Sequence, residues 1–294
     1  MIYRLKPILI ERSWGGTHLS EIYNEPNKRI AVSKLLSAFG NYENEVEGTG
    51  KTLKELFEEN PEIVAKGYNK KVFPLQVKLV DDESKQFSIQ NHPEGKTEFW
   101  HILEAKKDAF VYVGLKEDLT KEELRKYILD GTICDHLNKV RARTGDCFLI
   151  KPGTIHAIGK GILLVEVEES MDTTYRLFAF QKTEEDGSVK EIHLEEGLKA
   201  ARLDQYQVDR MYRNVEGELI RCRFVSVKRH RIFGSEFFYA DERSFHYIVV
   251  LSGEGKLISK RKEYPLNEAD SIFVTACHGS YSIEGDVEFL DITL

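Results

Sequence analysis

Short strand-like segments dominate the sequence, and this pattern limits the folds that the chain can adopt. Segments rich in β-branched and aromatic residues, and bounded by Gly, Pro or Asp, lie at 73–80, 85–92, 98–103, 109–115, 146–152 and 161–168. More segments of this kind follow residue 215, among them "FHYIVVLSG" and "VEFLDITL". Many short strands separated by turn residues predict an all-β protein built from antiparallel sandwiches or jelly rolls.

Two short helices are expected between the strands. Each begins with a capping box, in which a Thr caps the helix and a Glu three residues later bonds back to it. One box is formed by Thr52 and Glu55, the other by Thr120 and Glu123. A third helix is expected at 193–203, as a connector. The helices are therefore small insertions in a β framework.

Two stretches of the sequence resemble each other, "TGDCFLIKPGTIHAIGKGILLVEVEE" at 144–169 and "EADSIFVTACHGSYSIEGDVEFLDIT" at 268–293. Each has an Asp, an apolar strand, a turn, a short strand, a Gly and a closing apolar strand. This similarity predicts two copies of one β-barrel unit, in domains 1–212 and 213–294. His156 of the first stretch falls opposite Ser280 of the second. A site that uses His156 is therefore expected in the first domain only.

Charge and hydropathy exclude several classes of partner. The net charge is −7 and the sequence has no block of Lys and Arg, which argues against a nucleic-acid-binding protein. No apolar run reaches the roughly 18 residues that a membrane-spanning helix needs. The start, "MIYRLKPILIERSWGG", is too interrupted by charge and proline for a signal peptide. The scattered cysteines form no CxxC pattern, which indicates free thiols in a reducing cytoplasm.

The stretch "SIQNHPEGKTEFWHIL" at 88–103 carries the strongest candidate for a functional site. Gln90 and His92 are two apart, so they share one face of a strand, and the turn "HPEGK" brings Glu98 within reach of that face. His156 follows a second turn in "KPGTIHA". Two imidazoles, a carboxylate and an amide oxygen suit one zinc ion per chain, with iron, manganese or cobalt as alternatives. Because no thiolate is present, a coordination position is expected to stay open for water or substrate, as in catalytic zinc sites.

The same residues also allow an ordinary interpretation, as polar groups on a half-exposed strand. A single His in a β-rich protein is usually a hydrogen-bonded or surface residue. For this reason no role is assigned to the remaining histidines: His18, His101, His136, His193, His230, His246 and His278. Likewise, Lys78 and Arg176 taken alone are typical of salt-bridged residues at strand ends.

Four motifs taken together resemble one branch of the cupins, the type I mannose-6-phosphate isomerases. "FPLQVKLVDDESKQFSIQNHP" is similar to that family's first ligand segment, and "GKTEFW" to its Gly-Lys-x-Glu loop. "KPGTIHA" and "MDTTYRLF" resemble its Gly-Thr-x-His-Ala and Asp-x-x-x-Arg motifs. Order and spacing agree over about residues 73–180, and "SWGG" near the start and the C-terminal strands also fit.

The resemblance implies a two-cupin jelly-roll protein with a catalytic cupin at 1–212 and a second, metal-free cupin at 213–294 that supports it. The metal ligands would be Gln90, His92, Glu98 and His156. The catalytic groups would be Lys96, Asp172 and Arg176, and substrate contacts would come from Lys78 and Arg176. The implied reaction is the zinc-dependent interconversion of mannose 6-phosphate and fructose 6-phosphate through an enediol.

Two departures from the family pattern concern the substrate more than the chemistry. The loop between His92 and Glu98 is much shorter than in relatives. In "EVEESMD", Glu168 and Glu169 stand where relatives tend to have glutamines, so a more acidic pocket is expected.

Two other functions stay open at this point. One is a non-enzymatic cupin that binds a metal and a sugar or sugar phosphate, which metal binding without turnover would favour. The other is an iron-dependent dioxygenase, which an amide ligand fits poorly. The residues do not decide between a monomer and a homodimer, and they do not identify the catalytic base.

Overall fold

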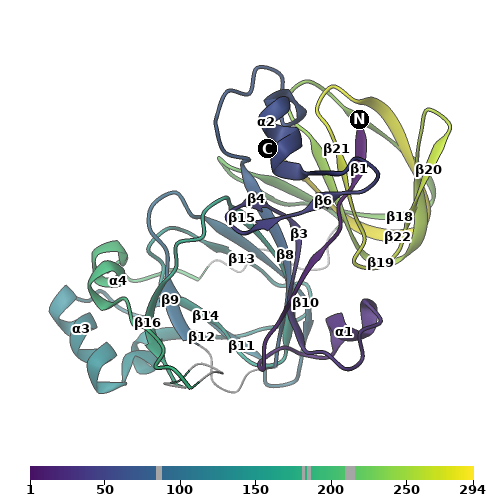
Figure 1. Ribbon diagram of the computed structural model, residues 1–294. Coiled ribbons are helices and arrows are strands. Elements are labelled where there is room, and N and C mark those ends of the chain that lie inside the picture. Colours follow the sequence, from purple (N-terminus) through teal and green to yellow (C-terminus); the bar gives the residue numbers. More distant parts are fainter. Residues whose placement is uncertain (84–87, 181–182, 184–186, 209–215) are drawn as a thin grey trace. The chain divides into compact units, whose positions relative to one another are not determined.

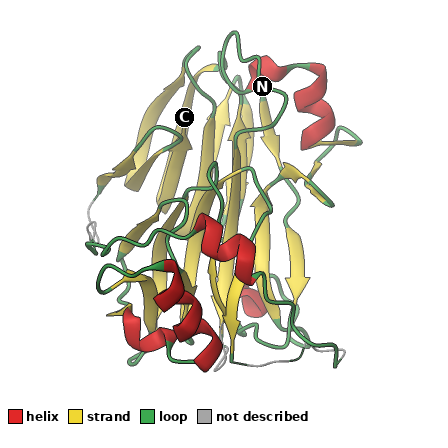
Figure 2. Cartoon of the chain, turned by 90° about the vertical axis from the view of Figure 1, so that its left-hand side faces the viewer, coloured by secondary structure: helices red, strands yellow, loops and turns green. Residues whose placement is uncertain are grey.

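The computed structural model describes residues 1–83, 88–180, 183, 187–208 and 216–294, and every structural statement below concerns these residues. Strands make up most of the secondary structure, as expected for an all-β protein (Figure 2). The helical segments are short: α1 (His18–Ile22), α2 (Leu53–Glu59), α3 (Lys121–Asp130), α4 (Leu194–Ala200), and the 3-10 turns η1 (Pro61–Ile63) and η2 (Ile133–His136). None of the described helices is long and apolar enough to cross a membrane.

Both expected capping boxes are present. Thr52 caps α2 by accepting a hydrogen bond from the backbone N–H of Glu55, whose side chain accepts from the N–H of Thr52. Thr120 and Glu123 form the same pair at the start of α3. The expected helix at 193–203 is the shorter α4. The four cysteines are free thiols, as predicted: Cys134, Cys147, Cys222 and Cys277.

The chain divides into two compact units. Unit 1 contains Met1–Ile8, Lys34–Gln76 and Asn214–Leu294, and unit 2 contains Leu9–Ser33 and Val77–Arg213. The domain boundary expected between residues 212 and 213 falls in the stretch 209–215, outside the described residues. The predicted first domain contains all of residues 1–212, whereas the contacts group Met1–Ile8 and Lys34–Gln76 with the C-terminal strands. One physical reason is that β1 (Ile2–Arg4) pairs antiparallel with β21 (Ser271–Val274).

Unit 1 is built on a seven-stranded sheet. Its order is β1, β21, β19 (His246–Ser259), β22 (Gly279–Thr293), β18 (Ser226–Ala240) and β17 (Gly217–Arg221), with β20 (Lys262–Leu266) paired to β19. Two small hairpins join β4 (Ala38–Phe39) with β5 (Tyr42–Glu43), and β6 (Glu45–Val46) with β7 (Lys51–Thr52). Its core includes Ile248, Leu257 and Phe289.

Unit 2 contains two sheets (Figure 1). The six-stranded sheet has the order β13 (Cys147–Ile150), β10 (Glu98–Ala105), β15 (Ile162–Glu169), β8 (Leu75–Asp82), β3 (Ile30–Leu36) and β2 (Ile8–Glu11). The five-stranded sheet has the order β12 (Leu137–Arg141), β11 (Phe110–Leu115), β14 (His156–Ile158), β9 (Ser88–Asn91) and β16 (Tyr175–Ala179).

The two sheets of unit 2 enclose one apolar core. Trp100 and Leu164 of the six-stranded sheet lie in the same cluster as Val111 and Val113 of the five-stranded sheet. Burying a large apolar side chain contributes roughly 1.5–3 kcal/mol. A second cluster joins the five-stranded sheet to α3 and α4, through side chains such as Leu198. The strands that carry the candidate site are therefore held by packed layers, as in a jelly roll.

Candidate metal centre

Strand pairing in unit 2 brings distant parts of the sequence to one place. In the register of the five-stranded sheet, Gln90 of β9 lies opposite His156 of β14 on one side and Arg176 of β16 on the other. His92 follows β9 directly, and Glu98 is the first residue of β10. Gln90 thus lies between two neighbouring strands, and His92 lies two residues further along the chain.

A glycine turn fixes the entry of the chain into β14. The N–H of Gly153 donates to the carbonyl of His92 at 2.8 Å, which ties "KPGTIHA" to the first ligand segment. Gly153 has φ +77°, and a Cβ at this position would lie 2.3 Å from the carbonyl oxygen of Ala200. Only glycine satisfies both conditions, since other residues pay for a left-handed backbone and would clash here.

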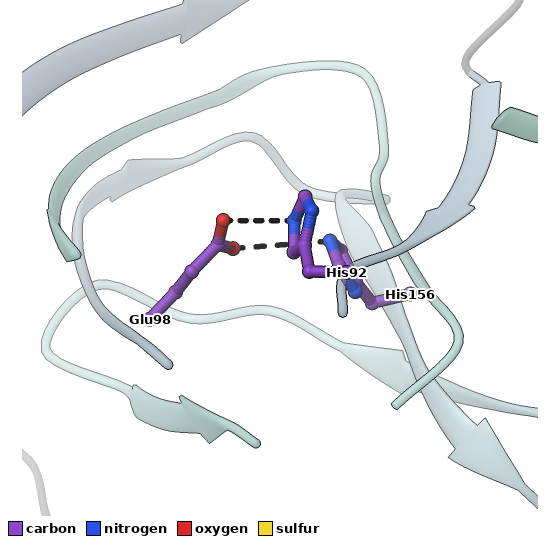
Figure 3. A group of neighbouring side chains, drawn as sticks. All are labelled: His92, Glu98 and His156. Carbon is purple, nitrogen blue, oxygen red and sulfur yellow. Dashed lines mark ion pairs between the residues drawn. The ribbon is translucent and has the colours of Figure 1, made fainter. Parts of the chain in front are cut away.

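Three buried side chains converge at this place (Figure 3). The Nε2 atom of His92 lies 2.9 Å from Oε1 of Glu98, and Nε2 of His156 lies 3.8 Å from Oε2 of the same carboxylate. Each of the three side chains is 2% exposed or less. Figure 3 shows the Glu98 carboxylate facing both imidazoles.

The backbone sets the tautomer of both histidines. Nδ1 of His92 lies 3.0 Å from the carbonyl oxygen of Thr173, and Nδ1 of His156 lies 2.9 Å from that of Thr154. A carbonyl only accepts, so each Nδ1 carries the hydrogen and each Nε2 presents a lone pair. Hydrogen bonds of this kind to the second ring nitrogen orient metal-ligating histidines.

Two of the converging atoms have no hydrogen-bond partner among the described residues. Nε2 of His92 and Oε2 of Glu98 are buried and accept no hydrogen bond from the described residues. Two lone pairs and a carboxylate directed at one another repel, and buried polar atoms without a partner are costly. A divalent ion removes both problems, and mixed nitrogen and oxygen donors suit zinc and its neighbours in the periodic table.

The pKa values of His156 and Glu98 favour the ligand forms. Burial lowers the pKa of His156 to about 4, and the nearby His92 acts in the same direction, so His156 is neutral at pH 7. Burial tends to raise the pKa of Glu98, but the surrounding His92, His156 and Lys96 hold it well below its usual value. Neutral imidazole and ionised carboxylate are the forms that bind metal ions.

Gln90 stands at the edge of the group. Its side-chain nitrogen lies 3.3 Å from Nε2 of His156, and the residue is half-buried. Rotating the side-chain amide by a half-turn exchanges its nitrogen and oxygen. Gln90 can then present its oxygen where the nitrogen now lies, next to the ligand atoms.

A series of alternating charges leads away from Glu98, all of them buried except the half-buried Lys78. Nζ of Lys96 lies 3.6 Å from Glu98 Oε1 and 3.0 Å from Glu168 Oε2. Nζ of Lys78 pairs with Glu168 Oε1, and it donates to Glu166 Oε1 at 2.8 Å. Burial works against the charge of Lys78, yet Glu166 and Glu168 raise its pKa. Burial raises the pKa of Glu168 to about 7, although Lys78 opposes the rise.

The other two predicted catalytic residues lie in and before β16. Arg176 is half-buried, and its Nη1 donates to the carbonyl of Glu191 at 3.1 Å. Asp172 is exposed, in the segment between β15 and β16. The structure therefore gathers Gln90, His92, Glu98, His156, Lys96 and Lys78, places Arg176 beside Gln90 by strand pairing, and leaves Asp172 in an exposed segment.

Sequence reasoning missed one buried member of this charge series. Glu166 takes hydrogen bonds from Lys78 and from the indole N–H of Trp100, at 2.8 and 3.0 Å. The alternation in "LLVEVEE" already put Glu166 on the same face as Glu168, and that pattern could have identified it. Glu169 points elsewhere, and it accepts from the backbone N–H of Thr97 at 2.9 Å.

Comparison with known proteins connects this chain to a family. The family model for the mannose-6-phosphate isomerase cupin domain matches residues 215–294. The mannose-6-phosphate isomerase ManA of Bacillus subtilis is 32% identical over 305 residues, which cover 96% of this chain and 96% of ManA.

Solved structures give the same result for the fold. The crystal structure of a mannose 6-phosphate isomerase from Bacillus subtilis superposes with a TM-score of 0.90 at 28% identity, covering 100% of this chain and 99% of that one. A zinc-bound mannose 6-phosphate isomerase shares the fold, with a TM-score of 0.79 at 13% identity and coverage of 99% and 98%. With 32% identity over almost its whole length, the chain belongs to the mannose-6-phosphate isomerase family.

Proposed function

We propose that this protein is an aldose–ketose isomerase that interconverts mannose 6-phosphate and fructose 6-phosphate, with one zinc ion per chain. The observation that carries the proposal is the buried group of His92, Glu98 and His156, whose ligand atoms converge and in which Nε2 of His92 and Oε2 of Glu98 have no hydrogen-bond partner among the described residues. Membership in the family supports the substrate, and the relatives' names support the reaction.

The proposed reaction moves hydrogen within one substrate. A proton leaves C1 of the open-chain ketose and a proton is added to C2, while the carbonyl moves from C2 to C1 through an enediol. No external oxidant or reductant is needed. A bound metal ion would act as a Lewis acid and stabilise negative charge on the substrate oxygens.

Lys96 is the buried cation next to the three ligand residues. It is 4% exposed, and its ammonium group lies between the carboxylates of Glu98 and Glu168. We assign it to proton transfer at the sugar oxygens or carbons, a role that typically contributes about 10²- to 10⁴-fold. Lys78, one carboxylate further along the series, is assigned to substrate binding.

Arg176 and Asp172 are assigned to substrate handling at the edge of the site. Arg176 lies beside Gln90 in the sheet, and a guanidinium makes paired hydrogen bonds to phosphate or sugar oxygens. Asp172, four residues earlier in an exposed segment, is assigned to opening the sugar ring. Both roles rest on the family motif that contains "MDTTYR".

The charges of the site support an anionic substrate. With Glu98, Glu166 and Glu168 ionised, the two buried ammonium groups leave an excess of one negative charge. A divalent ion changes this to one positive charge, which complements a phosphorylated sugar or a developing enediolate. Of the two carboxylates expected to make the pocket more acidic, Glu168 is paired with Lys78 and Lys96, and Glu169 instead accepts from the backbone N–H of Thr97.

A coupled assay with fructose 6-phosphate tests the proposal. We expect activity to disappear after chelation and to return with zinc, and cobalt, manganese and iron should be compared under the same conditions. His92→Ala should abolish both turnover and metal binding. Metal binding without turnover on any hexose phosphate would contradict the proposed reaction and favour a binding protein. The four free thiols support a cytoplasmic location, which localisation of a tagged protein would test.

A further inference from the structure

Glu168 lies at the centre of the buried charge series, and the roles proposed so far do not use it. Its side chain is 0% exposed. On β15 it is the direct register partner of Glu98 on β10, so the two side chains share one face of the six-stranded sheet. Lys78 comes from β8, the neighbour of β15 on the other side. Three adjacent strands therefore meet at this carboxylate.

We propose that Glu168 is a positioning residue, which holds the ammonium groups of Lys78 and Lys96 in place with one oxygen each. Oε1 pairs with Lys78, and Oε2 lies 3.0 Å from Nζ of Lys96. The proposal rests on the isomerase function proposed above, because the two lysines matter only if the site acts on a sugar phosphate.

Glu168 differs in its bonding from Glu166, the other carboxylate that contacts Lys78. Glu166 is anchored by the indole N–H of Trp100 at 3.0 Å as well as by Lys78. Neither oxygen of Glu168 accepts a hydrogen bond from the described residues, so this carboxylate is held by its ion pairs alone. Lysine side chains are flexible, and a fixed buried counter-ion is what confines their ammonium groups.

The chemistry of glutamine makes the proposal testable. The amide in E168Q has nearly the same shape, but it has one acceptor oxygen and one NH2 donor group. It can accept from one lysine, and it then presents a donor to the other. The substitution therefore removes the contact of residue 168 with Lys78 or with Lys96, and that lysine keeps only its contact with Glu166 or with Glu98. A purely space-filling role for Glu168 would tolerate the change.

We compare E168Q with E169Q, the same change at the next residue on the opposite face of β15. The amide in E169Q keeps an acceptor for the backbone N–H of Thr97. We expect E168Q to lower kcat/KM by about 100-fold, the usual cost of misplacing a reacting group by about 1 Å, while zinc content stays at one per chain. Loss in kcat indicates release of Lys96, and a rise in KM indicates release of Lys78. E169Q should retain wild-type values.

Combining E168Q with a substitution of either lysine shows whether Glu168 acts through the lysines. In Lys96→Met or Lys78→Met protein, the further effect of E168Q should shrink to a few-fold in the background that lacks the released lysine. Melting of the metal-free proteins gives a readout without turnover: E168Q should melt several degrees below E169Q, because Lys78 or Lys96 loses one of its two carboxylate partners. If E168Q does not fold, Lys78→Met/Glu168→Gln, which removes one charge of each sign, is compared with Lys78→Met.

Equal kinetics for E168Q and E169Q in an active wild-type background would overturn the inference. An undiminished effect of E168Q in both lysine backgrounds would also overturn it, because Glu168 would then act without them. Absence of turnover by zinc-loaded wild type is a different result. It would reject the proposed function, while the melting comparison would still decide whether Glu168 pairs with the lysines.

Discussion

The stretch that carries His156 and its counterpart in unit 1 share an architecture and differ in what they bury. In residues 144–169, β13 and β15 flank β10, and in residues 268–293, β21 and β22 flank β19. Asp146 and Asp270 each accept a hydrogen bond from the backbone N–H three residues earlier, at 3.0 and 2.8 Å. The similarity seen in the sequence is therefore present in the strand order and in the turns.

The two stretches differ in the continuity of the strand. In unit 2 a strand ends at Ile158 and the next begins at Ile162. The first, β14, belongs to the five-stranded sheet, and the second, β15, belongs to the six-stranded sheet. In unit 1 the corresponding residues form the single strand β22. His156 is buried at the start of β14, whereas Ser280 is exposed near the start of β22. The interruption of the strand in unit 2 therefore lets the two sheets contribute residues to one site, His156 from β14 and Glu168 from β15.

The buried charges differ in the same way. Counting along the two stretches, Glu166 corresponds to Leu290 and Glu168 to Ile292, and both apolar residues are fully buried. The same fold thus forms with apolar side chains at these positions. We therefore expect unit 2 to fold without its carboxylates, and we attribute them to the site. Replacing residues of one stretch by those of the other tests this comparison.

The largest expected effect comes from His156→Ser, which gives unit 2 the residue of unit 1. If His156 is a ligand, as proposed, its loss should reduce metal affinity and kcat/KM by more than the roughly 10- to 100-fold typical of supporting residues. Metal analysis by mass spectrometry and the coupled assay measure this. Ser280→Ala is the matched control, and a comparable loss of metal in that variant would contradict the comparison.

The next effect concerns stability. The triple change Lys78→Met/Glu166→Leu/Glu168→Ile replaces three charges of the series by apolar residues, two of them those of unit 1, and leaves Lys96 paired with Glu98. Such replacements are often neutral or stabilise by about 1–4 kcal/mol, whereas Glu166→Leu alone leaves Lys78 with fewer partners and should cost about 3–5 kcal/mol. Denaturant unfolding of the metal-free proteins distinguishes the two. A triple variant less stable than the single one would show that the charges hold the fold.

A smaller effect is expected at the shared turn. Gly153 and Cys277 correspond, with φ of +77° and +58°. Gly153→Ala should destabilise by about 1–3 kcal/mol, because its Cβ would approach the carbonyl of Ala200. Cys277→Gly should instead stabilise by about 1 kcal/mol by relieving a left-handed non-glycine residue. Thermal melting measures both changes in stability. If both substitutions destabilised the protein, or both stabilised it, the correspondence of the two turns would be contradicted.

The smallest effects test the two capping boxes, one in each unit. Thr52→Ala in α2 and Thr120→Ala in α3 each remove a cap and should cost about 1 kcal/mol. Neither helix contributes to the metal centre, so kcat should stay at the wild-type value. A change in kcat for Thr120→Ala would show that α3 influences the site beyond its packing.

Local patterns predicted much of this molecule. The alternation of strand residues placed Gln90 and His92 on one face, and the Thr–Glu spacing identified α2 and α3. The role of His156 depended on the resemblance of "KPGTIHA" to a family motif, since its partner strand lies far away in the sequence. No local pattern indicates that β1 pairs with β21, or that Lys78 of β8 meets Glu168 of β15. Those contacts depend on long-range strand pairing, which only the folded chain establishes.

Anomalous X-ray scattering at the zinc edge, from crystals of the zinc-loaded protein, tests the central claim most directly. The claim predicts one peak per chain within coordination distance of Nε2 of His92, Nε2 of His156 and the carboxylate of Glu98. A zinc-loaded protein with isomerase activity whose only peak lies away from these atoms would contradict it.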